Sequence, residues 1–572
     1  MVSATPASPS NPAALSDPLE GLDAEQRLAA ETLLGPVVLL AGAGTGKTRA
    51  ITHRIAHGVR SGVYSPSRVM VLSFTNRAAG EVRSRLKSLG AAGVASRTFH
   101  SAALSQLGHF WPEVAGGSLP SILNLKARLI GDAARVLKLK LDTATLRDVA
   151  SEIEWRKVSG LTIEQYADAA RTLPPSVSLD EVVGLHRAYE RLKDERRQLD
   201  FEDVLLACAG MLESEPRVAD QVRAQYRFFV VDEYQDVSPA QQRLLDLWLG
   251  ERNDVCVVGD ASQTIYSFAG ARPEFLLGFA KRFPEAVVIR LESNYRSTPS
   301  IVETANRLMR GRGGALELRS AAPEQGAAAP GSKPTFESFA TDAAEARAVA
   351  ARVADQLKAG TSASEIAVLY RMNVQAAPLE AALADLGVST VQRGGGRFFD
   401  QPEVKRALLM LRGATIVESD EPLFKTVSDV LRTLGWTQDP PPTGGAVRER
   451  WESLNAIMSM AEAQPPGTGI VAFVAELTDA ASTHDEPTLD AVTLATLHAA
   501  KGLEWHTVHL VGVNEGLVPI SYATAQEAID EERRLLYVGI TRARQRLHVS
   551  WSLSSQRGAR APSRFLSELG VS

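Results

Sequence analysis

One apolar segment that leads into a glycine-rich turn and a Gly-Lys-Thr triplet constrains the fold of this chain more than any other feature. The segment is PVVLLAGAGTGKT, residues Pro36–Thr48. Glycines let successive backbone N–H groups face one anion, and the N-terminus of the following helix attracts the same negative charge. A buried strand, a loop and a helix in this order predict a parallel α/β sheet that binds phosphate where its strand ends.

The loop carries the side chains that a nucleotide site requires. Lys47 is placed to reach the β- and γ-phosphates, and the Thr48 hydroxyl is placed to bind Mg²⁺. Ala41 stands at the first glycine position of the usual pattern, where its small side chain fits. The predicted nucleotide-binding residues here are Ala41, Gly42, Ala43, Gly44, Thr45, Gly46, Lys47, Thr48 and Arg49. A glycine-rich loop without a nucleotide is the simpler alternative, and the order of strand, loop, Lys-Thr and helix weighs against it.

A second apolar segment, FFVVDEYQD at Phe228–Asp236, ends in two adjacent acids. Burying unpaired charge is costly, so these acids need a cation. In phosphate-loop sites Mg²⁺ is held by the loop Ser or Thr and by an acid at the end of a second strand. We therefore expect Thr48 and Asp232 to bind the metal, which leaves Glu233 to orient or deprotonate the attacking water. A solvated acidic turn, the alternative, explains neither the apolar run nor the loop.

Length and composition exclude several classes of protein. A chain of 572 residues is expected to form several domains, and its net charge of −5 limits nucleic-acid binding to a local basic groove. Two cysteines, Cys208 and Cys256, fit buried thiols in a reducing compartment. The chain has no apolar run long enough to span a bilayer, and its Ala-, Ser- and Pro-rich N-terminus is unlike a secretion signal. We expect a cytoplasmic protein with no membrane partner.

Strand-like segments alternate with helical patterns and fall into two sets. The first set covers 37–40, 69–74, 228–233 and 255–260, and the second covers 287–291, 366–371, 507–512 and 546–551. Each set predicts a parallel sheet wrapped by helices, so the fold class is α/β with two lobes similar to RecA. The predicted domains are a disordered tail at 1–20, a first lobe at 21–100 and 199–286 with a helical insertion at 101–198, and a second lobe at 287–411 and 490–572 with a reduced helical insertion at 412–489.

Polar and aromatic residues near the strand ends extend the predicted site. Gln26 precedes the first strand, where an amide can pair with adenine, although a glutamine on a helix is usually only solvated. Gln263 follows the strand at 255–260 and is placed to sense a γ-phosphate. Tyr266 and Phe268 in the same motif either offer rings to unstacked bases or belong to the core.

Two early motifs and a later one have the residue types of a nucleic-acid groove. LSFTNRAAG and RTFHSAA combine an aromatic ring, hydrogen-bonding groups and a cation. Their candidate residues are Phe74, Asn76, Arg77, Thr98 and His100, although a lone histidine is more often structural. TLHAAKGLEW adds His498, Lys501 and Glu504 in a loop that we expect to enter a helix.

Two arginines are candidates for transition-state stabilisation. Arg296 follows Tyr295 in LESNYRS, and Arg542 lies in EERRLLYVGITRARQRL. Most arginines in such runs face solvent or pair with glutamates. An arginine that neutralises transition-state charge contributes about 10³- to 10⁵-fold in rate in other phosphoryl-transfer enzymes.

Ten segments, in this order, resemble those of superfamily-1A helicases of the UvrD/Rep/PcrA type. They are AGAGTGKT, SFTNRAA, TFHS, LDFEDVL, DEYQD, GDASQTIYSF, NYRS, GGGRFFDQPEVK, TLHAAKGLEW and RRLLYVGITRA. The resemblance implies a bacterial, nucleoid-associated enzyme of DNA repair or replication restart. Such an enzyme uses ATP and Mg²⁺ to move 3′-to-5′ on single-stranded DNA and to open tailed duplexes. We expect it to be a monomer in isolation.

The resemblance also implies individual roles. Gln26 and Tyr295 would hold adenine, and Glu504 would lie on the ribose side. The residues expected at the γ-phosphate are Gln263, Arg296 and Arg542. The residues expected along the DNA are Phe74, Asn76, Thr98, His100, Tyr266, Phe268 and His498.

The chain departs from the family pattern at four points. Ser262 stands where the family has an acid, and Phe268 stands where it frequently has a tryptophan. Ala269 stands where the family has an arginine, and Arg272 is the candidate replacement for that arginine. Only 96 positions separate Asp400 from Thr496, about half of what the resemblance leads us to expect, so the insertion of the second lobe is reduced. A translocase that displaces proteins without unwinding DNA alone is therefore the second interpretation. A P-loop ATPase with no DNA role is the third.

Overall fold

The computed structural model divides into two compact units. It describes residues 17–123, 125–169, 173, 176–321, 332–393, 399, 401–415, 421–439, 446–465, 467–483, 490–555 and 558–571. The first unit contains the chain up to Ala41, Gly46–Ala261 and Tyr266–Leu291. The second unit contains Gly42–Thr45, Ser262–Ile265 and the chain from Glu292.

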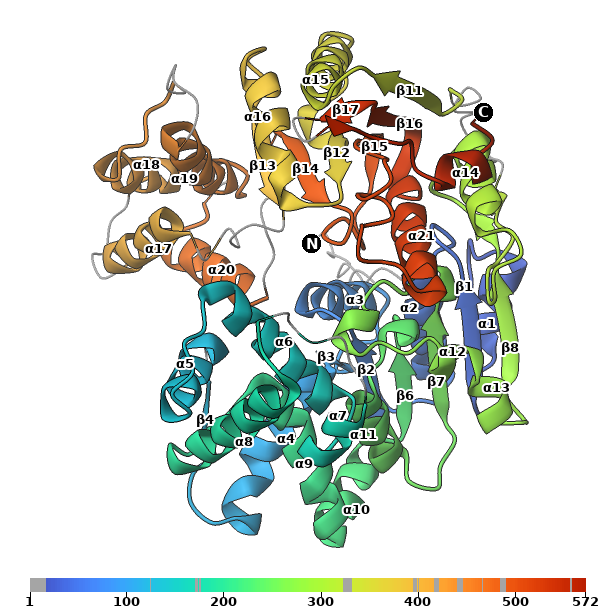
Figure 1. The fold of residues 1–572 in the computed structure, drawn as a ribbon. Helices are drawn as coiled ribbons and strands as arrows, with labels where there is room; N and C mark the ends of the chain where they lie inside the picture. Colours follow the sequence, from blue (N-terminus) through green and yellow to red (C-terminus); the bar gives the residue numbers. More distant parts are fainter. Residues whose placement is uncertain are drawn as a thin grey trace, which may run out of the picture. The chain divides into compact units, whose positions relative to one another are not determined.

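A six-stranded parallel sheet forms the centre of the first unit (Figure 1). Its strands, in spatial order, are β3 (Ala95–Thr98), β2 (Val69–Ser73), β6 (Phe228–Val231), β7 (Val255–Gly259), β1 (Val37–Ala41) and β8 (Val287–Leu291). Our assignment of Val287–Leu291 to the second sheet is wrong, because Val37 of β1 pairs with Val287 of β8. An apolar run marks a strand but does not select its partner, which is fixed by contacts distant in sequence.

Alternation along the strands gives this sheet two buried faces. Val38 and Met70 pack in one core with α4 (Phe99–Val114), α9 (Phe201–Ser214), α10 (Pro216–Gln225), α11 (Pro239–Leu249), α12 (Glu274–Leu277) and α13 (Phe279–Arg282). Val37 and Val69 pack on the other face with α1 (Ala24–Glu31), α2 (Lys47–Arg60) and α3 (Asn76–Ser88). Strands buried on both faces explain why these segments are continuous apolar runs.

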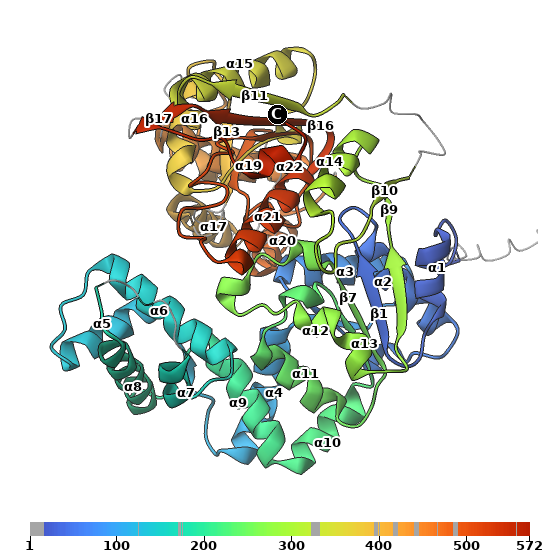
Figure 2. The ribbon, with the colours of Figure 1, turned by 45° about the vertical axis from the view of Figure 1, so that its right-hand side comes forward.

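The helical insertion of the first unit has a core of its own (Figure 2, teal helices). It comprises α5 (Lys126–Val136), α6 (Thr143–Val158), α7 (Ile163–Asp168) and α8 (Leu179–Glu195). The short strands β4 (Ser121–Ile122) and β5 (Gln198–Leu199) pair at its base. The boundary that we predicted at residue 101 falls inside α4, which packs with the sheet rather than with this insertion.

A buried ionic network connects the insertion to α9. Lys157 Nζ of α6 lies 2.6 Å from Asp200 Oδ2 and 2.6 Å from Asp203 Oδ1, and Lys193 of α8 contacts the same two acids. Asp200 is fully buried and caps α9 by accepting from the Asp203 N–H. Charges buried in this way are tolerated only because they are paired and hydrogen-bonded.

The second unit has its own six-stranded parallel sheet. Its strands, in spatial order, are β11 (Thr335–Phe339), β16 (Ala543–Ser552), β15 (Trp505–Leu510), β12 (Ile366–Tyr370), β14 (Val492–Thr496) and β13 (Thr390–Arg393). On one face the strands pack against α15 (Asp342–Lys358) and α16 (Ala376–Ala384). Helices α14 (Pro299–Met309) and α21 (Gln526–Ile540) contact each other and strand β16. The predicted α/β class with two parallel sheets is confirmed.

The second unit also contains several short elements. They are β9 (Ser293–Asn294), β10 (Arg319–Ser320), β17 (Ser554–Ser555), β18 (Gly558–Ala559) and α22 (Phe565–Glu568). After Thr496 the chain makes a turn and enters β15, so our expectation that TLHAAKGLEW leads into a helix is wrong. The segment from Trp505 to Leu510 is rich in β-branched and apolar side chains, which fit a buried strand.

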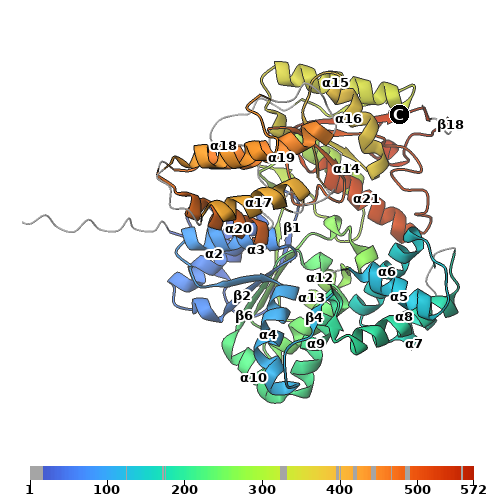
Figure 3. The same ribbon diagram turned by 90° about the vertical axis from the view of Figure 1, so that its left-hand side faces the viewer.

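Four helices of the second unit form a separate apolar cluster (Figure 3, orange helices). They are α17 (Pro402–Ala414), α18 (Leu423–Thr433), α19 (Ala446–Glu462) and α20 (Ile470–Thr483). The boundary predicted at residue 412 falls inside α17, whose Leu411 belongs to this cluster.

Some predicted segments lie partly outside the described residues. Most of the motif GGGRFFDQPEVK before Gln401 does so, as do residues 1–16 of the predicted tail. Within the rest of that tail, Leu19 is buried and the Pro18 carbonyl oxygen lies 2.5 Å from His53 Nδ1. In the described ranges, no helix has both the length and the apolar character needed to cross a membrane.

Candidate nucleotide and nucleic-acid sites

The glycine-rich loop joins β1 to α2 in a conformation that requires glycine. Gly44 and Gly46 have φ of +72° and +79°, in the left-handed region. A Cβ on Gly46 would lie 2.7 Å from Nε2 of Gln26, which is 2% exposed. Gln26 is therefore a buried neighbour of the loop and not a solvated surface glutamine.

Lys47 and the acids after β6 meet in the first unit. Lys47 Nζ lies 3.0 Å from Glu233 Oε1. Burial alone lowers the pKa of Lys47, but the carboxylates of Glu233, Asp232 and Asp260 outweigh burial and raise it. Burial and the neighbouring Glu233 raise the pKa of Asp232 to about 7, despite the opposing effect of Lys47. The charge of Lys47 therefore does not offset the effect of burial and of Glu233 on the pKa of Asp232.

These residues fit a magnesium ion that a nucleotide also coordinates. Asp232 supplies a carboxylate after β6, and Thr48 supplies a hydroxyl in the first turn of α2. Mg²⁺ is usually held by one or two carboxylates and completes its shell with phosphate oxygens and water. The part of the chain that the structure describes has no cluster of three or more His, Cys, Asp or Glu suited to a metal.

Glu233 has a strained backbone and a restrained carboxylate. Its φ is +53°, which is uncommon for a residue with a side chain, and its N–H donates to Asp232 Oδ1 at 2.9 Å. Gln235 Nε2 donates to Glu233 Oε2 at 2.5 Å. Strain of this kind persists at sites where the surroundings fix the conformation. Sequence reasoning assigned no role to Gln235, although it stands two positions after the predicted base.

The second unit brings the other predicted nucleotide residues together in two groups. Arg296 Nε lies 2.5 Å from Glu504 Oε2. The buried Arg542 donates from Nη2 to Gln263 Oε1 at 3.4 Å, and Lys501 Nζ donates to the Gln263 carbonyl at 2.7 Å. These contacts hold both predicted arginines in polar surroundings.

The loop residues assigned to the second unit have contacts of their own. The Tyr295 N–H donates to the Gly44 carbonyl at 2.9 Å, and Asn294 Nδ2 donates to the Ala43 carbonyl at 2.6 Å. Tyr295 is 54% exposed, which is compatible with a stacking role for its ring. Arg49, in the first unit, instead donates from Nη2 to the Gly21 carbonyl at 2.8 Å.

Three predicted base-stacking rings form one aromatic group in the first unit. Phe74 and Tyr266 stack with centroids 5.2 Å apart, and Tyr266 meets Phe268 edge-on at 6.0 Å. Phe74 is 41% exposed and Phe268 is 63% exposed. The exposure of Phe268 excludes the alternative that it is a core residue.

The other predicted DNA residues differ in their surroundings. Asn76 lies exposed at the start of α3, and Thr98 caps α4 by accepting from the Ser101 N–H at 3.1 Å. Burial, and to a lesser extent Lys126, lowers the pKa of His100 to about 4. Burial, with Arg371 and Lys501, lowers the pKa of His498 to about 4. Both histidines are therefore neutral at pH 7.

Sequence reasoning missed an aromatic partner of His100. Its ring stacks on that of Phe201, with centroids 3.8 Å apart, and Phe201 is 53% exposed. Phe201 lies in the motif LDFEDVL, which was recognised without a role for its ring. The signal available in the sequence was an aromatic residue directly after Asp200, the residue that caps α9.

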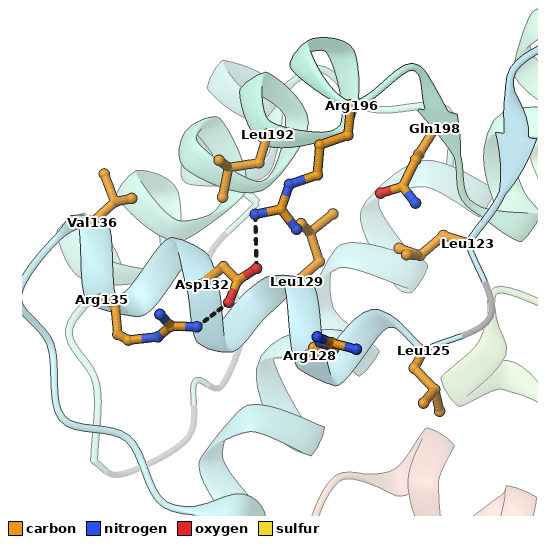
Figure 4. Close-up of a pocket in the computed structure, with 10 residues that line it drawn as sticks. All are labelled: Leu123, Leu125, Arg128, Leu129, Asp132, Arg135, Val136, Leu192, Arg196 and Gln198. Carbon is orange, nitrogen blue, oxygen red and sulfur yellow. Dashed lines mark hydrogen bonds and ion pairs between the residues drawn. The ribbon is translucent and has the colours of Figure 1, made fainter.

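A cavity of about 870 Å³ lies on the helical insertion, and no predicted site residue lines it (Figure 4). Its walls come mainly from α5 and α8 and mix leucines with arginines. Asp132, its acid, pairs with Arg135 and with Arg196 Nη2 at 2.8 Å. The cavity thus lacks the loop and the carboxylate pair that make the strand-end site suited to phosphate chemistry.

Comparisons with known proteins agree on one family. The UvrD/REP helicase N-terminal domain matches residues 22–284, and the UvrD-like helicase C-terminal domain matches 289–438 and 448–554. The chain is 46% identical to the ATP-dependent DNA helicase UvrD2 of Mycobacterium tuberculosis, over 96% of this chain and 82% of that protein. It is 28% identical to the ATP-dependent DNA helicase PcrA of Bacillus subtilis, over 96% of this chain and 86% of that protein. This chain therefore belongs to the UvrD/REP helicase family.

Proposed function

We propose that this chain is an ATP-dependent DNA helicase that hydrolyses ATP to move 3′-to-5′ on single-stranded DNA and to separate tailed duplexes. The observation that carries the proposal is the Lys47–Glu233 ion pair beside Asp232, at the end of a phosphate-binding loop. The names of its relatives, ATP-dependent DNA helicases UvrD2 and PcrA, support the same activity.

The chemistry assigned to the first unit is hydrolysis of the γ-phosphate. When ATP binds, the Lys47 ammonium group exchanges the Glu233 carboxylate for the phosphate oxygens. A nucleoside triphosphate carries more negative charge than one carboxylate. Glu233 then takes a proton from water while the water oxygen bonds to the γ-phosphorus. The bond from that phosphorus to the bridging oxygen breaks, which gives ADP and inorganic phosphate. Mg²⁺, held by Thr48 and Asp232, would neutralise phosphate charge.

The remaining nucleotide contacts are proposed from the resemblance. Gln26 and Tyr295 hold adenine, Glu504 lies on the ribose side, and the γ-phosphate is contacted by Gln263, Arg296 and Arg542. The burial of Gln26 against the loop and the exposed ring of Tyr295 support the adenine roles.

The DNA surface that we propose uses rings more than charges. Phe74, Tyr266 and Phe268 offer faces to unstacked bases, and stacking tolerates any base sequence, as a motor requires. His100 and His498 are neutral, so they contribute rings or hydrogen bonds and not positive charge.

A translocase that displaces proteins without unwinding DNA alone is the second candidate. The reduction that we predict for the insertion at 412–489 favours it, and helices α17–α20 form the described part of the chain in and around that range. Strand displacement on a 3′-tailed duplex, measured beside translocation on single-stranded DNA, separates the two. Displacement by the purified chain supports the helicase, whereas translocation without displacement supports the second candidate.

We also propose the setting in which the enzyme works. It acts as a monomer in the bacterial cytoplasm, at the nucleoid, in DNA repair or replication restart. Family membership supports this setting. Sedimentation of the purified chain tests the monomer, and a stable dimer at micromolar concentration would contradict it.

A further inference from the structure

Gln235 is a fully buried amide that joins the ends of two neighbouring strands. Its Nε2 donates to Glu233 Oε2 at 2.5 Å, and its Oε1 accepts from the Asp260 N–H at 3.0 Å. Glu233 follows β6 and Asp260 follows β7, which pair in parallel. Gln235 thus ties the side chain of Glu233 to the backbone of the adjacent strand.

The chemistry of Glu233 and Asp260 fixes the orientation of this amide, whose Nε2 also donates to Asp236 Oδ2 at 3.4 Å. A backbone N–H can only donate, so Asp260 requires the amide oxygen. An ionised carboxylate can only accept, so Glu233 requires the amide N–H. The reversed amide would lose both hydrogen bonds, which makes the bridge specific for glutamine.

Gly259, the last residue of β7, leaves room for the bridge. A Cβ at this position would lie 2.4 Å from Gln235 Oε1 and 3.2 Å from the Gln235 backbone nitrogen. A contact with backbone cannot be relieved by a change of rotamer. The lack of a side chain at Gly259 therefore provides the space that the Gln235 amide occupies.

We propose that Gln235 is a positioning residue that holds the Glu233 carboxylate in the orientation needed to accept a proton from water. The inference rests on the ATP hydrolysis proposed above. In the structure, Lys47 contacts Oε1 of Glu233 and Gln235 contacts Oε2. When Lys47 turns to phosphate, the bond from Gln235 continues to restrain the carboxylate, and a base misplaced by about 1 Å loses on the order of 10²-fold in rate.

The test is steady-state ATP hydrolysis, with single-stranded DNA present, by Gln235→Glu and Gln235→Ala beside the parent chain. Gln235→Glu keeps the volume and the acceptor for Asp260 but replaces the donor to Glu233 with a carboxyl oxygen. Gln242→Ala is the matched control. Gln242 is another buried glutamine, whose side chain accepts from Tyr234 Oη at 2.5 Å and donates to Asp246 Oδ1 at 2.7 Å.

We expect kcat to fall about 10- to 100-fold in both Gln235 variants, as for other residues that orient a catalytic group, with little change in KM for ATP. Gln242→Ala should lose stability in thermal unfolding yet keep its kcat. Parent-like kcat in Gln235→Glu, or an equal fall in Gln242→Ala, would overturn the inference. If Gln235→Ala does not fold, the kcat of the isosteric variant Gln235→Glu tests the inference alone.

The parent chain and Glu233→Gln separate this inference from the proposed function. If DNA does not stimulate ATP hydrolysis by the parent chain, the proposed function itself is contradicted. An active parent, an inactive Glu233→Gln and fully active Gln235 variants would sink the role of Gln235 alone. In the double variant Glu233→Gln/Gln235→Ala, we expect no loss beyond that of Glu233→Gln, because Gln235 acts through Glu233.

Discussion

Lys47 Nζ lies 3.0 Å from Glu233 Oε1 in the first unit. The predicted phosphate-binding cation and the predicted base therefore form an ion pair. A charge-assisted contact of this kind keeps both side chains ordered at the strand end. It also means that each must exchange partners when a nucleotide binds. The first two predictions follow from this pair.

Replacement of Lys47 by alanine should abolish ATP turnover. The variant loses the cation that neutralises phosphate oxygens, and the loss of one such group in other enzymes costs about 10²- to 10³-fold in kcat. Lys87→Ala, which removes an exposed lysine of α3, is the control and should hydrolyse ATP like the parent. Hydrolysis by Lys47→Ala at the parent rate would refute the role of Lys47.

Glu233→Gln should stop hydrolysis without stopping nucleotide binding. Loss of a general base costs about 10²- to 10⁴-fold in rate. Because Glu233 competes with phosphate for Lys47, the variant should bind ATP–Mg²⁺ at least as tightly as the parent in a fluorescent-nucleotide titration. Near-parental hydrolysis would show that another group activates the water.

Phe268→Ala should weaken the response to DNA more than basal hydrolysis. The ring is 63% exposed, so its removal leaves no cavity in the core, and stacking on a base contributes about 1–3 kcal/mol. The concentration of single-stranded DNA that gives half-maximal ATPase activity should rise about 5- to 150-fold, by conversion of that energy.

Phe424→Ala is the control for the exposed ring. Phe424 is 56% exposed on α18, and its removal should leave the DNA response unchanged. An equal loss of basal and DNA-stimulated hydrolysis in Phe268→Ala would mean that the ring supports the fold instead of the DNA.

The lysine–aspartate network should make the first unit sensitive to acid. Burial alone would raise the pKa of Asp200, but Lys157 and Lys193 outweigh it and hold that pKa well below its usual value of 3.8. A carboxyl whose pKa is lower in the folded chain than in the unfolded chain binds fewer protons when folded. Its contribution to stability is therefore complete above about pH 4 and is lost as the pH falls further.

Asp200→Asn tests this network in urea unfolding. It should cost about 3–5 kcal/mol at pH 7, because two buried lysines lose a partner, and the difference from the parent should shrink below pH 4. Asp220→Asn is the control, since Asp220 has a side chain that is 77% exposed. Equal stability of Asp200→Asn and the parent at pH 7 would contradict the account.

The strands and site residues that could be predicted from sequence were those with a local sequence pattern. The strand before Gly42, the strand before Asp232 and the residues at their ends could be recognised because burial on both faces produces continuous apolar runs. Lys47 follows β1 and Glu233 follows β6, and the two meet because these parallel strands, with β7 between them, end at the same edge of the sheet.

The features that sequence reasoning missed depend on partners distant in the chain. Val287–Leu291 looked like any other strand, and only pairing with β1 places it in the first sheet. β13, with the sequence TVQR, is half-buried at a sheet edge and gave no apolar run. The bridge of Gln235 to Asp260 spans two strands, so no spacing within DEYQD could reveal it.

The rate of ATP hydrolysis by the purified chain, with and without single-stranded DNA, tests the central claim most directly when Glu233→Gln is measured beside it. The account predicts that DNA raises the rate of the parent and that Glu233→Gln hydrolyses almost nothing in either condition. A parent rate that DNA leaves unchanged, or a Glu233→Gln rate close to that of the parent, would contradict it.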